Sequence, residues 1–470
     1  MAELIKKGKL LRAGLVYTIS NVILRGISFF TMPLFIRLLT PEEFGRYNVF
    51  ISFESVLFMF SGLTMHVSIK NAYYDQKDNY NSYIQNCVYL DFFNSIFILI
   101  LSNIVCFFWS KEIDLNFYEV NLLTLAGFCG ATTNIYSSKL IMDYKAGDFA
   151  FVSFLTIIFG ILISLLFIFT FFESDHYLGR VVGAILGQVI ATIYVLWRIF
   201  KNGFYKIDIK QWKYGIKISL PIIPHGLSQV ALSSIDRVMI KYIYNAAQAG
   251  IFSFTYTVSL IPQVLFQSVS SIWEPWFFEQ MNNKNYIEIR RKSTIFCLVI
   301  SVVFIMISCI VPEFVLLMAT EEYVEAIDIS IIVLIGSYFA TLYNIPCEVE
   351  YFLKKTKHIA TSTLVCAIVN CLLNLFLMQF FNYKVAAYVS MLSYLLYFIF
   401  HMYMSKYLTN KWLFDVSRFI LIIILSVVLM IISLLCIDIR SVRLFILLLF
   451  FSLGFLKHKQ IFLIIKELKK

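Results

Sequence analysis

The chain has 470 residues, of which 60% are hydrophobic and only 14% are charged, and its formal net charge is +10. A soluble domain typically holds about 25% charged residues, so this composition excludes an ordinary soluble enzyme. The positive charge therefore indicates contact with anionic lipid headgroups at a membrane surface rather than binding to nucleic acid.

Hydrophobic stretches long enough to cross a bilayer recur along the chain. A transmembrane helix needs roughly 20 predominantly apolar residues. We predict an all-α polytopic membrane protein with about fourteen such helices, at 13–38, 44–69, 84–109, 117–138, 148–172, 178–197, 218–243, 249–272, 294–319, 327–352, 359–380, 385–404, 412–436 and 441–456. The connections between them are too short to form a soluble domain.

Basic residues are distributed unevenly among these connections. The two tails and every second connection hold 28 of the chain's 39 Lys and Arg, whereas the other connections are short and often acidic, as at Glu173-Ser174-Asp175. Basic segments flanking membrane helices stay on the cytoplasmic side. We therefore predict an even number of spans, with both termini in the cytoplasm, in a multi-pass inner-membrane protein. The basic, amphipathic residues 1–12 do not read as a cleaved signal peptide.

The longest basic connection, at 198–217, predicts an amphipathic helix on the cytoplasmic face and a linker between two halves. A weak repeat with an offset of 205 residues lays Phe44-Gly45 over Ala249-Gly250 and the first predicted helix over the seventh. Halves of six helices joined in this way are parallel repeats, an architecture of secondary transporters. The predicted domains are an N-terminal lobe at 1–200, a linker at 201–217, a C-terminal lobe at 218–410, and a last segment at 411–470 with two further helices and a basic tail.

Glycines and cysteines in the predicted helices indicate packing. Gly179, Gly183 and Gly187 form a face of small residues on the sixth helix, which favours close helix contact over a moving hinge. The nine cysteines form no CxxC pair and the six histidines no HExxH motif. We therefore interpret the cysteines as small packing residues and expect no metal site.

Ionisable groups inside the spans are candidates for a function, because charge at the membrane centre is costly. The main candidates are Asn21 and Arg25 in the first helix, Glu54 in the second, and His225, Asp236 and Arg237 in the seventh. One interpretation is structural ion pairing, such as Arg25 with Glu54. The other is a cavity with surplus positive charge, in which Arg25 and Arg237, at equivalent places in the two halves, bind one ligand. The planar fork of arginine suits a phosphate, as in a pyrophosphate-linked substrate.

Weaker candidates for such a cavity are Arg37, His66, Lys70 and Trp273. Lys70 ends the second helix, where extension of its side chain to the interface explains it without a function. Trp273 ends the eighth helix, where an interface anchor is commoner than a platform for a sugar ring. Pro33, Pro221 and Pro224 predict that the first helix of each half can bend.

Two stretches are similar to a known family. One is residues 33–47, PLFIRLLTPEEFGRY, and the other joins LPIIPHG at 220–226 to Ser234-Ile235-Asp236-Arg237 and to AGIFS at 249–253. Both resemble the polysaccharide transporter family of Wzx-type O-antigen flippases, within the multidrug/oligosaccharidyl-lipid/polysaccharide exporter superfamily. The resemblance runs from residue 10 to about 405, and the last two helices show nothing diagnostic.

The resemblance implies two six-helix lobes around a central cavity, plus two extra helices. It also implies that undecaprenyl-pyrophosphate-linked oligosaccharide repeat units, for O-antigen of lipopolysaccharide or a related surface polysaccharide, are flipped from the cytoplasmic to the periplasmic leaflet by alternating access. The family's Asp-Arg pair carries over to Asp236-Arg237. Expected partners are the lipid-linked oligosaccharide and anionic membrane lipid, with a polysaccharide polymerase and a chain-length regulator as further candidates. No cofactor is expected, and the coupling cation, H⁺ or Na⁺, stays open.

Two other classes of function compete with a flippase. A drug/cation antiporter of the same superfamily would need acidic cavity groups, whereas the deepest groups here favour arginine. A membrane polymerase or ligase of polysaccharide would need a substantial periplasmic loop, and the odd-numbered connections have only about 4 to 9 residues. Glycosyltransferase genes beside this one would favour the flippase over the antiporter.

Overall fold

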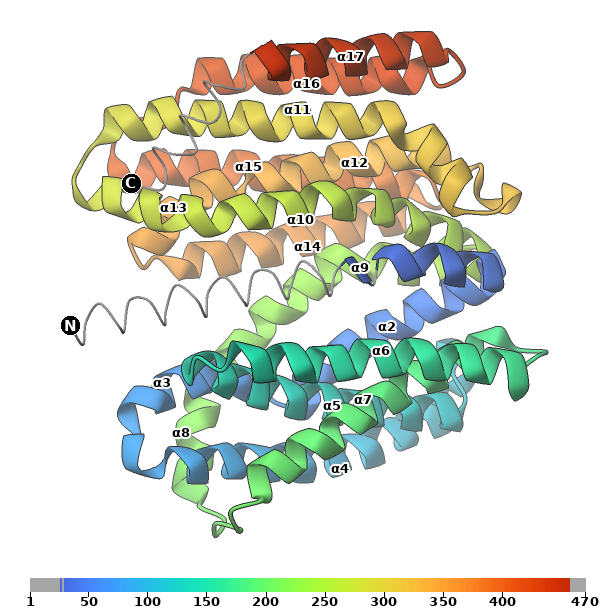
Figure 1. Ribbon diagram of the computed structural model, residues 1–470, viewed down its shortest axis with the longest axis vertical. Helices are drawn as coiled ribbons and strands as arrows, with labels where there is room; N and C mark the ends of the chain where they lie inside the picture. Colours follow the sequence, from blue (N-terminus) through green and yellow to red (C-terminus); the bar gives the residue numbers. More distant parts are fainter. Residues whose placement is uncertain (1–25, 28, 457–470) are drawn as a thin grey trace. The chain divides into compact units, whose positions relative to one another are not determined.

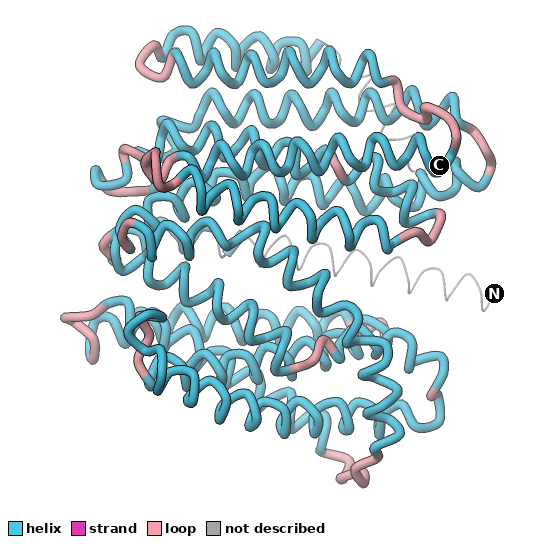
Figure 2. Tube along the Cα trace, turned by 180° about the vertical axis from the view of Figure 1, so that it is seen from behind, coloured by secondary structure: helices cyan, strands magenta, loops and turns pink. Residues whose placement is uncertain are grey.

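The protein is a helical membrane protein. A computed structural model describes residues 26–27 and 29–456, and every regular element in that part of the chain is a helix (Figures 1 and 2). Nine helices of the described part are long and apolar enough to cross a membrane, and one bent pair adds a tenth. The prediction of an all-α, multi-pass membrane protein is confirmed, whereas the count of fourteen and the cytoplasmic termini stay predictions.

The chain divides into two compact units between Ser234 and Ile235. Unit 1 contains a short helix at Phe29–Leu38 and then α2 (Pro41–Ser61), α3 (Ser68–Asp75), α4 (Tyr80–Ile113), α5 (Phe117–Met142), α6 (Ala146–Thr170), α7 (His176–Phe200) and α8 (Ile209–Ser219). The division falls inside α9 (Ile223–Ile243). Unit 2 continues with α10 (Ala246–Asn282), α11 (Tyr286–Met318), α12 (Ala326–Leu342), α13 (Asn344–Phe352), α14 (Thr356–Leu377), α15 (Val385–Thr409), α16 (Val416–Leu435) and α17 (Arg440–Leu456).

The predicted unbroken helix at 44–69 is interrupted in the structure. The chain turns by 62° between α2 and the short helical segment at Met65–Asp75. Leu63 and Thr64 have φ values of 45° and 50°, in the left-handed region that ends a helix. Gly62 lies so close to Ala131 of α5 that any larger side chain would collide with it. The break therefore depends on tertiary contact and is not visible in the hydropathy of the segment.

The glycines of α7 lie against α6, as the packing interpretation predicts. A Cβ on Gly183 would collide with the backbone of Ser164, and one on Gly187 would collide with the backbone of Gly160. The Ser164 hydroxyl, placed at this contact, donates to the Gly160 carbonyl at 2.6 Å. Small residues thus allow α6 and α7 to approach at backbone distance, which is the usual way for helices to associate in a membrane.

The segment predicted to link two halves packs on unit 1. In α8, Trp212 donates its indole N–H to the carbonyl of Asn86 in α4 at 2.9 Å. Gly215 of the same helix lies against Met65 and Tyr83. The predicted domain limits stay predictions, because the described contacts place α8 without showing where a lobe begins or ends.

The offset of 205 residues joins two positions with the same structural role. Thr40 caps the N-terminus of α2, and Asn245, 205 residues later, caps the N-terminus of α10. The same register, however, pairs Arg237 with Met32, so Arg25 and Arg237 are about two helical turns out of register. The repeat therefore supports the alignment of the helix starts but not the equivalence of the two arginines.

The last two helices belong to unit 2, where they lie along α11 (Figure 1). Ser433 of α16 donates to the carbonyl of Ser308 at 2.9 Å. Arg443 of α17 forms a bidentate ion pair with Glu313 of α11, at 2.6 and 2.9 Å. A forked pair of this kind fixes orientation as well as contact, so α17 is held in one register against α11.

Reporter fusions should confirm the predicted topology. The charge bias predicts periplasmic signals at Glu112, Ser174 and Tyr323, and cytoplasmic signals at Gln76, Tyr205, Tyr286 and Thr356. Paired alkaline phosphatase and fluorescent protein fusions at the seven positions measure this directly. A cytoplasmic signal at Ser174 or Tyr323 would contradict the fourteen-helix topology.

Candidate functional site

LLTPEEFG, within one of the two stretches that carry the family resemblance, contains the capping group of α2. Thr40 accepts a hydrogen bond from the backbone N–H of Glu43 at 3.2 Å, and Glu43 Oε2 accepts from the backbone N–H of Thr40 at 2.9 Å. Pro41 occupies the first helical position, where its missing N–H costs nothing. The motif therefore has a structural explanation, because this reciprocal capping fixes where the helix begins.

The second carboxylate oxygen of Glu43 accepts hydrogen bonds at the start of another helix. Glu43 Oε1 accepts from the backbone N–H groups of His176 at 2.8 Å and Tyr177 at 3.4 Å, at the start of α7. The His176 ring also contacts the carbonyl of Leu38 through Nδ1 at 2.9 Å. A carboxylate is stabilised at a helix N-terminus by unpaired N–H groups and by the helix dipole. One side chain thus fixes the starts of α2 and α7 together.

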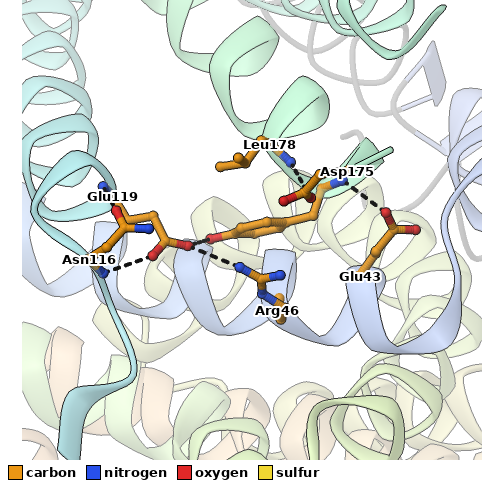
Figure 3. Close-up of polar contacts among 7 residues, drawn as sticks. Glu43, Arg46, Asn116, Glu119, Asp175 and Leu178 are labelled. Carbon is orange, nitrogen blue, oxygen red and sulfur yellow. Dashed lines mark hydrogen bonds and ion pairs between the residues drawn. The ribbon is translucent and has the colours of Figure 1, made fainter. Parts of the chain in front are cut away.

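A buried carboxylate connects α5 to the same end of unit 1. Glu119 is 3% exposed, accepts from the Tyr177 hydroxyl at 2.7 Å, and pairs with Arg46 at 3.5 Å (Figure 3). The Arg46 guanidinium lies over the Tyr177 ring at 4.2 Å. We name Glu43, Arg46, Glu119 and Tyr177 the N-cap cluster. Because it joins the starts of three helices, its role is to hold this end of unit 1 rigid.

Removing the shared cap should destabilise the protein. In Glu43→Ala, the first turns of α2 and α7 lose an acceptor, and a lost cap costs about 0.5–2 kcal/mol per helix. We expect a lower thermal unfolding midpoint of the purified protein in detergent. Glu42→Ala is the matched control, because Glu42 is exposed and adjacent. Equal midpoints for the two variants would contradict the double capping role of Glu43.

Beside this cluster, unit 1 contains a pocket of about 240 Å³ between the helix at Phe29–Leu38, α2, α6 and α7. Arg180 of α7 lines it, and its guanidinium lies over the rings of Phe35 at 3.9 Å and Tyr47 at 4.9 Å. Arg180 also donates to the Ser164 hydroxyl at 2.9 Å. The aromatic faces stabilise the cation, and no carboxylate forms an ion pair with it in the described part of the chain.

Glu54 is positioned next to this pocket. Gln188, which lines the pocket, donates its side-chain N–H to Glu54 Oε1 at 2.7 Å. The predicted pairing of Glu54 with Arg25 cannot be compared with this contact, since Asn21 and Arg25 lie outside the described residues. Unit 1 therefore brings Glu54, Gln188 and Arg180 together, and of these only Glu54 is predicted from the sequence.

Asp236 is the centre of a polar network in unit 2. It is 1% exposed, and it accepts hydrogen bonds from Ser390 at 2.5 Å, Asn374 at 2.7 Å and Tyr256 at 3.2 Å. Asn370 extends the network by accepting from Asn374 at 3.1 Å. Four helices, α9, α10, α14 and α15, thus meet at one carboxylate. Buried charge is tolerated when hydrogen bonds surround it in this way.

Arg237 points to a different partner. Its guanidinium lies over the Tyr256 ring at 4.7 Å, and its Nε is buried without a hydrogen-bond partner. No carboxylate forms an ion pair with it among the residues that the structure describes. Asp236 and Arg237 are therefore not paired with each other, as expected for neighbours about 100° apart on a helix. Tyr256 contacts both residues and joins them into one site.

The remaining predicted residues are not brought together. Arg37 and Lys70 are exposed, while His66 is half-buried with its ring 5.8 Å from that of Phe58. His225 is half-buried, and its Nδ1 has no hydrogen-bond partner in the described part. Trp273 is 2% exposed and stacks on Phe296 at 4.7 Å. Its ring is therefore packed inside unit 2.

A further buried cluster in unit 2 was missed from the sequence. His401 of α15 and Glu350 of α13 are fully buried, with Nδ1 and Oε1 2.5 Å apart. The ligand atoms of Cys347, Glu350 and His401 lie within 4.8 Å of one another, the arrangement of a metal site. The short His401–Glu350 contact is a hydrogen bond that leaves no room for an ion between these two atoms. The expected lack of a metal site stays a prediction.

Comparison with known proteins gives both a family and a fold. A family model described as polysaccharide biosynthesis protein matches residues 10–281. The capsular polysaccharide biosynthesis protein CapF of Staphylococcus aureus is 23% identical over 347 residues, covering 68% of this chain and 80% of that protein. The structure is similar to the lipid II flippase MurJ in an inward closed conformation, with a TM-score of 0.73, 14% identity, and coverage of 95% of this chain and 100% of the other. An inward-facing multidrug resistance MATE transporter gives a TM-score of 0.66 at 13% identity, over 83% and 95% of the two chains.

Proposed function

Because this chain belongs to the polysaccharide biosynthesis protein family, we propose that it is a flippase for lipid-linked oligosaccharides. The cargo is an undecaprenyl-pyrophosphate-linked repeat unit of O-antigen or a related surface polysaccharide. The protein moves it from the cytoplasmic to the periplasmic leaflet by alternating access. The transporter fold supports a role in transport rather than in enzymatic catalysis.

The observation that carries the proposal is the presence, inside apolar helices, of two arginines that have no carboxylate at ion-pair distance among the described residues. Arg237 in unit 2 and Arg180 in unit 1 each lie against aromatic rings, and neither forms an ion pair in the described part of the chain. Burying such a charge is costly unless a partner of opposite sign is supplied. A pyrophosphate supplies that partner, since arginine donates to it through two parallel N–H groups.

The residues proposed to bind this cargo are those of the predicted cavity, with Arg237 foremost. Asp236 holds Tyr256, and through it Arg237, in place. Arg25 retains its proposed role as a second phosphate ligand. We propose no cofactor, and H⁺ and Na⁺ remain the two candidates for a coupling cation. A polysaccharide polymerase and a chain-length regulator are the proposed protein partners.

A drug/cation antiporter is the second candidate, and the likeness to the MATE transporter fold favours it. The buried carboxylate of Asp236 is the kind of group that a cation carrier requires. Three neutral donors already occupy its two oxygens, however. The antiporter therefore ranks below the flippase.

Deletion of the gene tests the proposal directly. In the deletion strain, lipid-linked oligosaccharide should accumulate in the cytoplasmic leaflet, and surface polysaccharide should disappear. Chemical analysis of lipid-linked sugars accessible from each side of sealed vesicles measures both. Unchanged sugars together with increased sensitivity to cationic drugs would favour the antiporter. Accumulation of flipped but unpolymerised units in the periplasmic leaflet would instead favour a polymerase or ligase.

A further inference from the structure

A second pocket of unit 1, also about 240 Å³, lies where α5 and α7 end and α4 begins. Four cationic side chains line it: Lys139, Lys145, Arg198 and Lys201. The charge bias predicts that this end of unit 1 faces the cytoplasm. None of the four residues belongs to the candidate site, so the charge they concentrate here needs its own explanation.

Nearby carboxylates balance only part of this charge. Asp143 accepts from Lys139 at 2.5 Å and lies 4.0 Å from Lys145, so one carboxylate is shared by two lysines. Arg198 pairs with Asp148 at 3.1 Å. Lys201 is exposed and has no ion pair in the part of the chain that the structure describes. Four cations therefore face two carboxylates, which leaves an excess of about two positive charges around the pocket.

The wall of the pocket is fixed by buried hydrogen bonds. Gln85 is 2% exposed and donates to the carbonyls of Ile199 at 3.1 Å and Gly203 at 2.8 Å. Its Oε1 accepts from the backbone N–H of Tyr205 at 2.8 Å. The chain after α7, which carries Lys201, is thus held in place without a ligand. A ligand binds more tightly to a site that is already ordered, because no binding free energy is spent on ordering its loops.

Aromatic side chains around the pocket indicate a position in the headgroup layer. Trp197, Phe204 and Tyr205 are 59%, 80% and 48% exposed, on the end of α7 and the chain that follows it. Trp and Tyr are enriched where a membrane helix meets the lipid headgroups. A basic pocket between helix ends in the headgroup layer lies beside the phosphates of lipids. It is therefore more accessible to a lipid phosphate than to the phosphate of a soluble molecule.

We propose that this basic pocket binds the phosphate of an anionic phospholipid, with the headgroup inside the pocket and the acyl chains along α5 and α7. The positive excess matches a phosphodiester, and a zwitterionic headgroup brings a cation of its own that Lys145 and Lys201 repel. The volume admits a single headgroup but not an oligosaccharide. The inference is independent of the proposed flippase function.

Lipid titration followed by native mass spectrometry tests the proposal. Full-length protein in detergent is titrated with phosphatidylglycerol or with phosphatidylcholine of the same acyl chains. We expect tighter binding of phosphatidylglycerol to the wild type. In the double variant Lys145→Gln, Lys201→Gln, this binding should weaken by roughly fivefold for each lysine removed. Lys355→Gln, Lys357→Gln is the matched control, because these exposed lysines lie at the start of α14 in unit 2; it should bind as the wild type does.

A variant that is expected to bind the lipid more tightly shows whether a loss of binding in the double variant is caused by misfolding. Asp143→Asn removes the carboxylate shared by Lys139 and Lys145, so it should tighten the binding of phosphatidylglycerol. Equal affinity of the wild type for the two lipids, or equal loss in the double variant and its control, would overturn the proposal. Displacement of phosphatidylglycerol by millimolar inorganic phosphate at constant ionic strength would also overturn it, because the pocket would then be a site for soluble anions.

Discussion

Arg237→Ala is expected to abolish surface polysaccharide while the protein remains inserted in the membrane at its normal level. The guanidinium lies over Tyr256, has a buried Nε without a hydrogen-bond partner, and has no carboxylate partner in the described part of the chain. Alanine therefore breaks no ion pair that the described residues form, but it removes the proposed phosphate ligand. Immunoblots of membranes and electrophoresis of surface polysaccharide measure the two quantities separately.

A conservative replacement of Arg237 and an alanine substitution of an exposed control arginine make this prediction more specific. Arg237→Lys should rescue only in part, because lysine supplies charge without the planar fork. Arg418→Ala should leave the polysaccharide unchanged, since the Arg418 side chain is 71% exposed and contacts Asp415 at the start of α16. Arg25→Ala is expected to match Arg237→Ala. Normal polysaccharide in both alanine variants at native expression would refute the phosphate-binding role.

Asp236→Ala is expected to destabilise the protein itself. The substitution leaves Ser390, Asn374 and Tyr256 without a common acceptor in a site that is almost fully buried. Each buried donor left unpaired costs about 1–3 kcal/mol, so the total loss of unfolding free energy is on the order of 3 kcal/mol or more. We expect a clearly lower thermal midpoint in detergent and less folded protein in the membrane.

Ser233→Ala serves as the control for this loss, because Ser233 is exposed on the same helix and bonds only to its neighbours. Its thermal midpoint should match that of the wild type. If Asp236→Ala also unfolds at the wild-type temperature but no longer supports polysaccharide export, Asp236 acts in transport and not in the architecture of unit 2. A wild-type result in both assays would mean that the network around Asp236 is dispensable.

Much of the fold could be predicted from the sequence because only a few kinds of structure can cross a bilayer. The length of each apolar stretch identifies most of the helices, and the basic connections predict in which direction each helix crosses the membrane. Both signals depend on the local composition of a segment. The break after α2 could not be predicted in the same way. It depends on the contact of Gly62 with Ala131, almost seventy residues later, and on the left-handed backbone of Leu63 and Thr64.

The candidate site was predictable only in part, for a related reason. Asp236 and Arg237 stand out because charge is rare within a span, but their partners Ser390, Asn374 and Tyr256 are neutral and look like ordinary helix residues. Arg180 carries a weaker signal than Arg237, because it is only the third residue of the predicted helix at 178–197 and a basic residue is common at the end of a span. In the structure the glycines of α7 contact α6, while Arg180 lines the pocket.

The motif at residues 38–45 also shows how little a resemblance to a family says about the role of each residue. It carries part of the resemblance to the family, yet its chemistry is that of helix ends, with Thr40 and Glu43 forming a capping box. That box can be read from the spacing of the residues. The bond from Glu43 to His176 cannot, because it joins residues 133 positions apart.

The two capped helix starts also bear on how a weak internal repeat can be detected. A cap needs only a side-chain oxygen that accepts a hydrogen bond, and Thr40 and Asn245 both supply one although their residue types differ. Exchange among Ser, Thr, Asp and Asn at such a position leaves the helix start intact while it erases identity between the copies. Internal repeats in proteins of this kind are therefore better sought by aligning helix starts according to chemical role than by matching letters.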